Sequence, residues 1–208
     1  MSIRGDLAAY YEEEARLGSR GPVGGRRLAL RSAFIEVLAS EARSSVIDFG
    51  AGPGRDGSGF LEAGVRYLGI DLAPGNAALA AEREIAVLPA SITAPPLVDH
   101  CFDAGWSMST VMHLPADEVA AATRAMSTVL RPAAPLIIGL WGGDGGDYVD
   151  ETQLPGQRRY FGLRSPDHNR QLLSSAADVE DEQIWDAGPD GWHYQVFFLR
   201  TRAEQQSC

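Results

Sequence analysis

Two different spacings of hydrophobic residues alternate along the middle of the chain. Short apolar runs at 45–49, 65–72 and 135–141 have the length of strands, and the last is apolar throughout, as in a sheet covered on both faces. The segments between such runs read as helices. Strands that alternate with helices predict a parallel sheet, which we expect to extend from about Ser45 to Leu140.

The expected elements of this sheet follow each other in a simple order. Strands are expected at 45–49, 65–72, 85–91, 101–109 and 135–141. Helices are expected around Phe60 and Leu61, over 74–84 and from about Ala116 to Leu130, where Pro132 ends the last helix.

Segments of different character flank the sheet. Two helices are predicted before it, around 6–17 and 26–42, joined by the glycine-rich connector 18–25. The polar, glycine-rich stretch 141–159 predicts a long active-site loop or an ordered excursion, and a helix is expected from Ser165 to Leu173.

Two strand-like runs, 179–188 and 192–200, are separated by a Gly-Pro-Asp-Gly turn. They predict an antiparallel hairpin beside the parallel sheet. We expect Trp185, Trp192 and Phe198 to pack within this hairpin.

Composition narrows the class of protein. A chain of 208 residues with 45% hydrophobic and 22% charged residues suits one globular domain. No apolar run approaches the roughly 20 residues that span a bilayer, and the N-terminus has no signal-peptide core, so a cytoplasmic location is expected. The net charge of -10 argues against binding to nucleic acid or anionic membranes and favours a small, neutral-to-cationic substrate.

Cysteine and histidine give no sign of a disulfide framework or a metal site. Cys101 and Cys208 are two isolated thiols, and the four histidines are scattered without ligand spacing. No metal is therefore expected.

The most informative segment is VIDFGAGPGRDGSGF, residues 46–60. An apolar strand that carries Asp48 runs into Gly50, Gly52 and Gly54, and a helix follows. Glycine lets the backbone turn sharply and approach a ligand closely, and the helix terminus offers free N–H groups.

Two cofactors compete for this loop. Gly52, Gly54 and Gly57 satisfy the GxGxxG pattern of nicotinamide enzymes, which is weak by itself. The triplet also begins one register earlier, at Gly50, and the acid Asp48 precedes it. Asp71, at the end of the second strand, suits ribose hydroxyls in either cofactor.

The motifs resemble those of class I S-adenosylmethionine-dependent methyltransferases, in particular the subgroup whose glycine loop reads GxGPGRD. VIDFGAGPGRD is similar to the first motif of that family and YLGIDLAP to the second. FDAGWSMSTVMHLP resembles the fourth-strand motif, and VLRPAAPLIIGLW resembles the helix and fifth strand. The four motifs occur in the family's order, which favours a methyltransferase over a nicotinamide oxidoreductase.

The resemblance implies a fold and a division of the chain. It implies an α/β, Rossmann-like fold: a mostly parallel seven-stranded sheet with a C-terminal antiparallel hairpin and helices on both faces. Residues 1–44 would form an N-terminal helical lid, and residues 45–208 the S-adenosylmethionine-binding core.

The resemblance also implies which residues hold the donor. Asp71 would accept hydrogen bonds from the ribose hydroxyls, and Asp48 would lie near the amino end of the methionine moiety. Ser91 stands where the family usually has an acid for the adenine amino group. Arg55 and Asp56 have an alternative interpretation as ordinary cap and surface residues. The full expected donor set is Tyr11, Asp48, Gly50, Ala51, Gly52, Gly54, Arg55, Asp71, Leu72, Ser91, Ile92, Ser107 and Met108.

Candidates for the acceptor side come from the same edge of the sheet. His113 follows the fourth strand and is the candidate general base, with a structural role as the alternative. Tyr10, Trp141 and Tyr160 are expected in the substrate pocket, where Phe161 and Arg164 are further candidates. Tyr10 and Tyr11 resemble aromatic residues of a lid helix, with core packing as the alternative.

The predicted function is transfer of a methyl group from S-adenosylmethionine to a small molecule at O, N or C. A catalytically silent S-adenosylmethionine-binding protein and a nicotinamide-dependent oxidoreductase are the alternatives. Neither the acceptor nor the oligomeric state follows from the sequence.

Overall fold

The computed structural model describes residues 2–186 and 191–203. Its centre is a seven-stranded sheet in the order β3-β2-β1-β4-β5-β9-β8. The strands are β1 (Ser45–Phe49), β2 (Arg66–Asp71), β3 (Val87–Pro89), β4 (Ala104–Met108), β5 (Pro135–Gly142), β8 (Asp178–Asp186) and β9 (His193–Arg200). The predicted fold class is confirmed.

The first five strands pair in parallel, and β9 pairs antiparallel with both β5 and β8. The turn predicted between β8 and β9 lies largely outside the described residues. An antiparallel strand next to β5 departs from the all-parallel order of dinucleotide-binding sheets. The order therefore favours the methyltransferase interpretation over the nicotinamide one.

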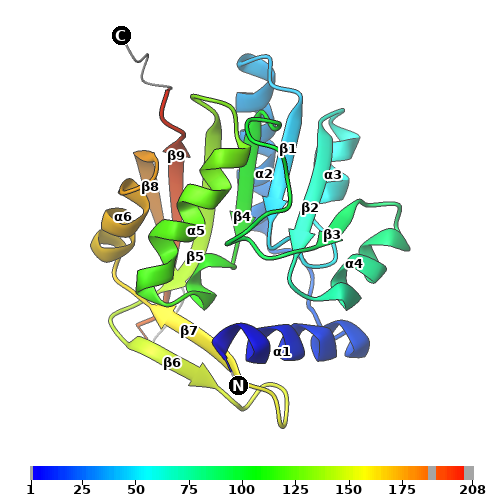
Figure 1. Ribbon diagram of the computed structural model, residues 1–208, viewed down its shortest axis with the longest axis vertical. Helices are drawn as coiled ribbons and strands as arrows, with labels where there is room; N and C mark the ends of the chain where they lie inside the picture. Colours follow the sequence, from blue (N-terminus) through cyan, green and yellow to red (C-terminus); the bar gives the residue numbers. More distant parts are fainter. Residues whose placement is uncertain (1, 187–190, 204–208) are drawn as a thin grey trace.

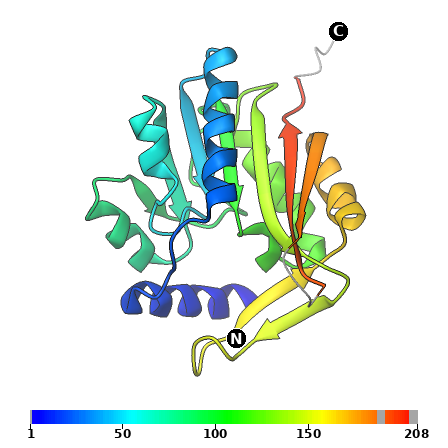
Figure 2. The same cartoon turned by 180° about the vertical axis from the view of Figure 1, so that it is seen from behind.

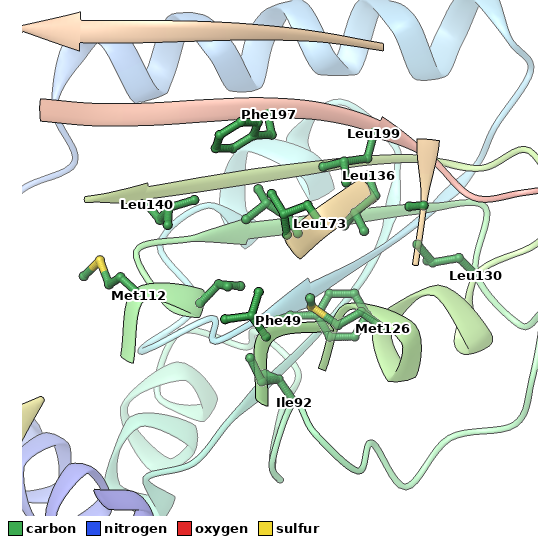
Figure 3. Close-up of a cluster of buried hydrophobic side chains, with 14 of the residues drawn as sticks. Phe49, Ile92, Met112, Met126, Leu130, Leu136, Leu140, Leu173, Phe197 and Leu199 are labelled. Carbon is green, nitrogen blue, oxygen red and sulfur yellow. The ribbon is translucent and has the colours of Figure 1, made fainter. Parts of the chain in front are cut away.

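Helices cover both faces of the sheet. The helices α2 (Gly25–Ser40), α3 (Gly57–Glu62) and α4 (Pro74–Ala81) contribute to one buried cluster, with Phe34, Phe60 and Trp106 in mutual ring contact. Figure 2 shows α2 lying along this face. The helices α5 (Ala116–Val129) and α6 (Pro166–Ser174) cover the opposite face, where Phe49, Met126 and Phe197 belong to the second cluster (Figure 3).

The first helix has a different position. The helix α1 (Ile3–Leu17) lies across the edge of the sheet where β1, β2 and β4 end, which we call the carboxyl edge (Figures 1 and 2). It contacts α4 and β7. The sequence analysis expected residues 1–44 to form a lid. In the structure α2 packs into the core, so of these residues only α1 and the connector lie over this edge.

The polar stretch after β5 forms an ordered excursion. It contains a separate two-stranded sheet of β6 (Gly146–Asp150) and β7 (Arg159–Leu163), which lies beside α1 below the carboxyl edge (Figure 1). The sequence predicted either a long active-site loop or an ordered excursion for this stretch, and the structure shows the ordered excursion.

In the described part of the chain, no helix has both the length and the apolar character needed to cross a membrane.

Candidate active site

A cavity of about 1270 Å³ opens at the carboxyl edge. Its walls come from α1, the connector, the loops after β1, β2 and β4, and the ends of β5, β8 and β9. The hairpin β6–β7 closes one side. Ligands of open α/β sheets bind at this edge, so the cavity lies where the sequence places the site.

The glycine loop needs its glycines. Gly50, Gly52 and Gly54 have φ angles of 79°, 55° and 69°, a region that side chains rarely adopt. A Cβ at Gly50 would also collide with the Thr110 hydroxyl, and one at Gly52 with the Arg20 guanidinium. Gly50 and the adjacent Ala51 line the cavity, whereas Gly52 and Gly54 shape the turn behind it.

Asp71 holds this loop to the end of β2. Its carboxylate accepts hydrogen bonds from the Gly52 N–H at 2.7 Å and from the Ala73 N–H and the Asn76 amide at 3.0 Å. Two carboxylate oxygens offer about four acceptor positions, so one is left for a ligand. Asp71 lines the cavity, as a group that binds ribose hydroxyls must.

The end of the cavity next to β3 suits a flat base. Leu72, Ser91 and Ile92, the residues predicted for an adenine, all line it. The Ser91 hydroxyl is hydrogen-bonded to the Thr93 hydroxyl at 2.8 Å. Ser91 thus leaves the cavity polar at the position where the family has an acid.

Asp48 lies behind the cavity wall. It is completely buried and accepts a hydrogen bond from the Tyr67 hydroxyl at 2.9 Å. Burial, together with the nearby Asp56, raises the pKa of Asp48 to about 8. Its second oxygen has no hydrogen-bond partner among the described residues.

Asp56 is part of a buried network below the glycine loop. Its carboxylate accepts hydrogen bonds from Arg27 and from the Trp106 indole at 2.7 and 2.8 Å, and Arg31 lies 3.4 Å away. Its side chain caps no helix and is fully buried. Asp56 is thus the N-cap residue of α3 by position, without a capping side-chain hydrogen bond, and its interpretation as a surface residue is wrong, because it is buried with two arginines from α2 beside it.

The fourth strand supplies both buried and lining residues. Ser107 is buried and donates to the Phe49 carbonyl at 2.9 Å, away from the cavity. Met108 and Ser109 line the cavity, and so does Thr110, which the sequence did not predict. Ser109 has a φ of 59°, which strains a residue that is not glycine.

His113 links three parts of the site. Its Nδ1 lies 2.7 Å from the Tyr160 carbonyl oxygen, which can only accept, so Nδ1 carries the proton. Its Nε2 then accepts from the Tyr11 hydroxyl at 2.6 Å. Burial lowers the pKa of His113 to about 3 and raises that of Tyr11 to about 12. Both rings are therefore neutral at physiological pH, and both imidazole nitrogens are occupied.

Two predicted pocket residues do not line the cavity. Tyr10 is buried and stacks on the Arg159 guanidinium, whose carbon lies 4.5 Å from the ring centre. The Tyr160 hydroxyl donates to Asp147 at 2.7 Å. Arg164, the further candidate, does not line the cavity either, whereas Phe161 does.

Aromatic side chains gather at the cavity end next to β5. Trp141, a predicted substrate-pocket residue, lines the cavity. Trp185, Trp192 and Tyr194 also line it, although the sequence analysis assigned both tryptophans to packing in the hairpin alone. The register of β8 and β9 places Trp185 opposite Tyr194 at this edge, and Trp192 directly precedes β9.

Arginines also line the cavity, among them Arg55, which belongs to the expected donor set, and Arg20, which the sequence did not indicate. The Arg20 guanidinium lies over Gly52, pairs with Glu14 at 2.8 Å and is 5.3 Å from the Tyr11 ring centre. The Arg55 side chain lines the cavity and donates to the Arg20 carbonyl. The glycine-rich sequence around Arg20 indicated only a connector.

Within the described residues, no cluster of three or more His, Cys, Asp or Glu side chains has the arrangement of a metal site.

Comparison with known proteins adds a domain assignment. Residues 46–133 match the family model described as a methyltransferase domain. No curated protein sequence matches the chain significantly.

Solved structures share the fold. The 1,6-didemethyltoxoflavin-N1-methyltransferase of Burkholderia thailandensis, crystallised with 1,6-didemethyltoxoflavin and S-adenosylhomocysteine, has a TM-score of 0.70 at 22% identity, over 96% of this chain and 87% of that one. An S-adenosylmethionine-dependent methyltransferase of Methanosarcina mazei has a TM-score of 0.70 at 13% identity, over 78% and 94%. A sugar N-methyltransferase of Streptoalloteichus has a TM-score of 0.61 at 18% identity, over 84% of this chain and 87% of that one.

At these identities, the likeness establishes the fold. Residues 46–133 match a methyltransferase domain model, and the whole chain has the fold of the class I S-adenosylmethionine-dependent methyltransferases.

Proposed function

We propose that this methyltransferase transfers a methyl group from S-adenosylmethionine to a small molecule that occupies the other half of the same cavity. The observation that carries the proposal is one continuous cavity of about 1270 Å³. Ligand pockets commonly measure about 300–1,000 Å³, so this one has room for a donor and an acceptor. The Burkholderia neighbour was crystallised with both kinds of molecule.

The donor fits the half of the cavity near β1, β2 and β3. Asp71 has an acceptor position left for a ribose hydroxyl, and Leu72 and Ile92 present apolar surface to an adenine. Gly50 and Ala51 line this half of the cavity, so we place the methionine moiety beside them. We place the methionine carboxylate against Arg20, because its guanidinium lies over the glycine loop.

The chemistry asks little of a general base. When bound, S-adenosylmethionine supplies a methyl carbon that is already activated by its sulfonium. The chain must then align the acceptor and exclude water, and alignment alone contributes about 7–11 kcal/mol. We call α1 and the hairpin β6–β7 together the lid. They cover the cavity and so suit this task.

We propose that His113 is a positioning residue, which holds the lid in place, and not a general base. A general base needs a free nitrogen within reach of the proton that it removes. Here Nε2 holds the Tyr11 hydroxyl of α1 and Nδ1 holds the Tyr160 carbonyl of β7. His113 therefore joins the two halves of the lid.

Calorimetric titration tests the proposal. S-adenosylmethionine, S-adenosylhomocysteine and NAD are titrated in parallel into the wild type, Asp71→Asn and Asp103→Asn. Asp103 is a matched control, because it is a buried, hydrogen-bonded carboxylate that does not line the cavity. We expect the adenosyl ligands to bind, NAD not to bind, and Asp71→Asn to lose roughly 10-fold or more in affinity, since hydrogen bonds to charged groups contribute about 1.5–3 kcal/mol.

Asp103→Asn should keep the wild-type affinity. Binding of NAD, absence of adenosyl binding, or equal affinity in the wild type and Asp71→Asn would each contradict the proposed donor site.

A further inference from the structure

Three aromatic side chains form a row across the antiparallel part of the sheet. Trp141 of β5 and Trp185 of β8 both stand opposite Tyr194 of β9 in the strand register. The ring centres lie 5.2 Å apart for Trp141 and Tyr194, and 5.3 Å apart for Trp185 and Tyr194. All three line the cavity, and we call the row the aromatic wall: Trp185 stacks on Tyr194 at an interplanar angle of 21°, and Trp141 meets Tyr194 edge-on at 86°.

A second aromatic group also lines the cavity. Tyr148 of β6, Phe161 of β7 and Trp192 before β9 have ring centres 5.6–6.2 Å apart. The two groups thus contribute six aromatic side chains to the lining of this cavity. Aromatic groups of this extent bury flat apolar surface and fix the orientation of what stacks on them.

The topology separates these aromatics from the donor site. Asp71 and the glycine loop stand at the ends of β2 and β1, whereas the row stands on β5, β9 and β8, on the other side of β4. A ring against the row therefore leaves the proposed donor half free.

The charges of the cavity disfavour a cationic acceptor. Among the residues that the structure describes, the acids lining the cavity are Glu14, Asp71, Glu118 and Asp150. Glu14, Glu118 and Asp150 pair with Arg20, Arg4 and Arg159, and Asp71 accepts three hydrogen bonds. The described lining also includes the arginines Arg4, Arg20, Arg26, Arg27, Arg55 and Arg159.

The local charge thus differs from that of the whole chain. The net charge of -10 led us to expect a neutral-to-cationic substrate. Among the described residues lining the cavity, arginines outnumber acids, and each acid is already paired or hydrogen-bonded, so none is left to pair with an ammonium group.

We propose that the methyl acceptor is a flat, conjugated ring without positive charge, stacked against the row Trp141–Tyr194–Trp185. This inference rests on the proposed function and names its substrate class. Ser109 and Tyr194, whose hydroxyl oxygens lie 3.0 Å apart at the end of β4, present polar groups to the edge of such a ring. The strained backbone of Ser109 holds its hydroxyl there.

Three probes test the inference by calorimetry in the presence of saturating S-adenosylhomocysteine. The compounds 2-naphthoate and decahydro-2-naphthoate have the same charge and skeleton, but only the first is flat, and choline is a cation. We expect 2-naphthoate to bind at least about 3-fold more tightly than its saturated analogue, as aromatic pairing predicts. Choline should bind least.

Variants of the row separate stacking from bulk. Trp185→Leu keeps an apolar side chain but removes the aromatic face, and we expect it to weaken 2-naphthoate binding about 3- to 10-fold. Trp185→Phe should restore most of this loss. Ile184→Ala is the control, because Ile184 is an exposed neighbour on β8 that does not line the cavity.

S-adenosylhomocysteine affinity is measured for every variant and should stay at the wild-type value, which also shows that each variant is folded. Equal binding of the flat and saturated probes, tighter binding of choline, or an unchanged 2-naphthoate affinity in Trp185→Leu would overturn the inference. Loss of S-adenosylhomocysteine binding in the wild type would instead contradict the proposed function.

Discussion

At the scale of single residues, burial gives two carboxylates of the glycine-loop region different properties. Asp71 is fixed by three donors and faces the cavity. Asp48 is completely buried behind it, and its pKa is raised to about 8 by burial and by Asp56. The sequence indicates an acid at both positions, but only the packing around Asp48 shows that its charged form is disfavoured.

Asp48→Asn is expected to change how stability depends on pH. In the wild type the folded-state pKa of about 8 exceeds the ordinary value of 3.8, so the folded state loses stability as pH rises between these values. The loss amounts to about 1.4 kcal/mol for each pH unit in that window. The amide of Asn does not ionise and can still accept a hydrogen bond from Tyr67. The free energy of unfolding of the variant should therefore increase relative to that of the wild type as pH rises toward 8.

Urea unfolding of both proteins at pH 5, 6, 7 and 8, without ligand, measures this difference. A difference in unfolding free energy that stays constant with pH would show that Asp48 ionises normally in the folded protein.

Arg20 is expected to contact only one part of the donor. Replacing it by Gln removes the cation over Gly52, so binding of S-adenosylhomocysteine should weaken about 10-fold, the effect of one charge-assisted hydrogen bond. Binding of 5′-methylthioadenosine, which lacks the amino-acid moiety, should not change. Calorimetry with both ligands decides the matter, and equal losses for the two would place Arg20 away from the carboxylate.

At the scale of elements, α1 is attached to the site by a few polar contacts. Tyr11 binds His113, Tyr10 stacks on Arg159 of β7, and Glu12 accepts from the Gly75 N–H of α4 at 2.8 Å. Much of its surface is exposed, which is typical of elements that open locally.

Tyr11→Phe is expected to loosen α1. The variant leaves the buried Nε2 of His113 without its donor, a loss of about 1–3 kcal/mol, so amide hydrogen exchange in α1 should become roughly 5- to 150-fold faster. Tyr10→Phe is the matched control, since the Tyr10 hydroxyl makes only a 3.3 Å contact with Gln153. Exchange rates that are the same in both variants and the wild type would argue against His113 as the residue that holds the lid.

The elements differ in how well the sequence predicts them. β1 occurs at the predicted residues 45–49, because its apolar run ends at glycine. The strand β6 could not be predicted, since most of its residues are exposed. The short strand β7 could not be predicted either: its Phe161 and Leu163 belong to the core, but only its non-local pairing with β6 makes it a strand. The parallel order around β1 follows from βαβ connections, whereas the place of β9 between β5 and β8 depends on non-local pairing.

The site shows the same division. Gly50, Asp71 and Leu72 could be predicted, because each follows directly from a strand end and a local motif. Arg20 and Trp185 could not, because a flexible connector and a distant strand bring them to the cavity.

At the scale of the whole molecule, both lid elements and the core contribute to one cavity, so ligand binding should stabilise the entire fold. At a concentration 100 times its dissociation constant, S-adenosylhomocysteine should add about 2.7 kcal/mol. For a chain of this size, that corresponds to a rise in Tm of about 5–11 °C. Scanning calorimetry measures the shift, with NAD and Asp71→Asn as controls, and a shift with NAD would contradict the donor assignment.

The aromatic wall also makes the molecule its own optical reporter. Of the four tryptophans in the chain, Trp141, Trp185 and Trp192 line the cavity, and Trp106 is fully buried against Phe34 and Phe60. A conjugated acceptor that stacks on the wall would quench the emission of the three cavity tryptophans. The blue-shifted emission of Trp106 would persist as an internal standard, so acceptors can be screened by fluorescence without any label.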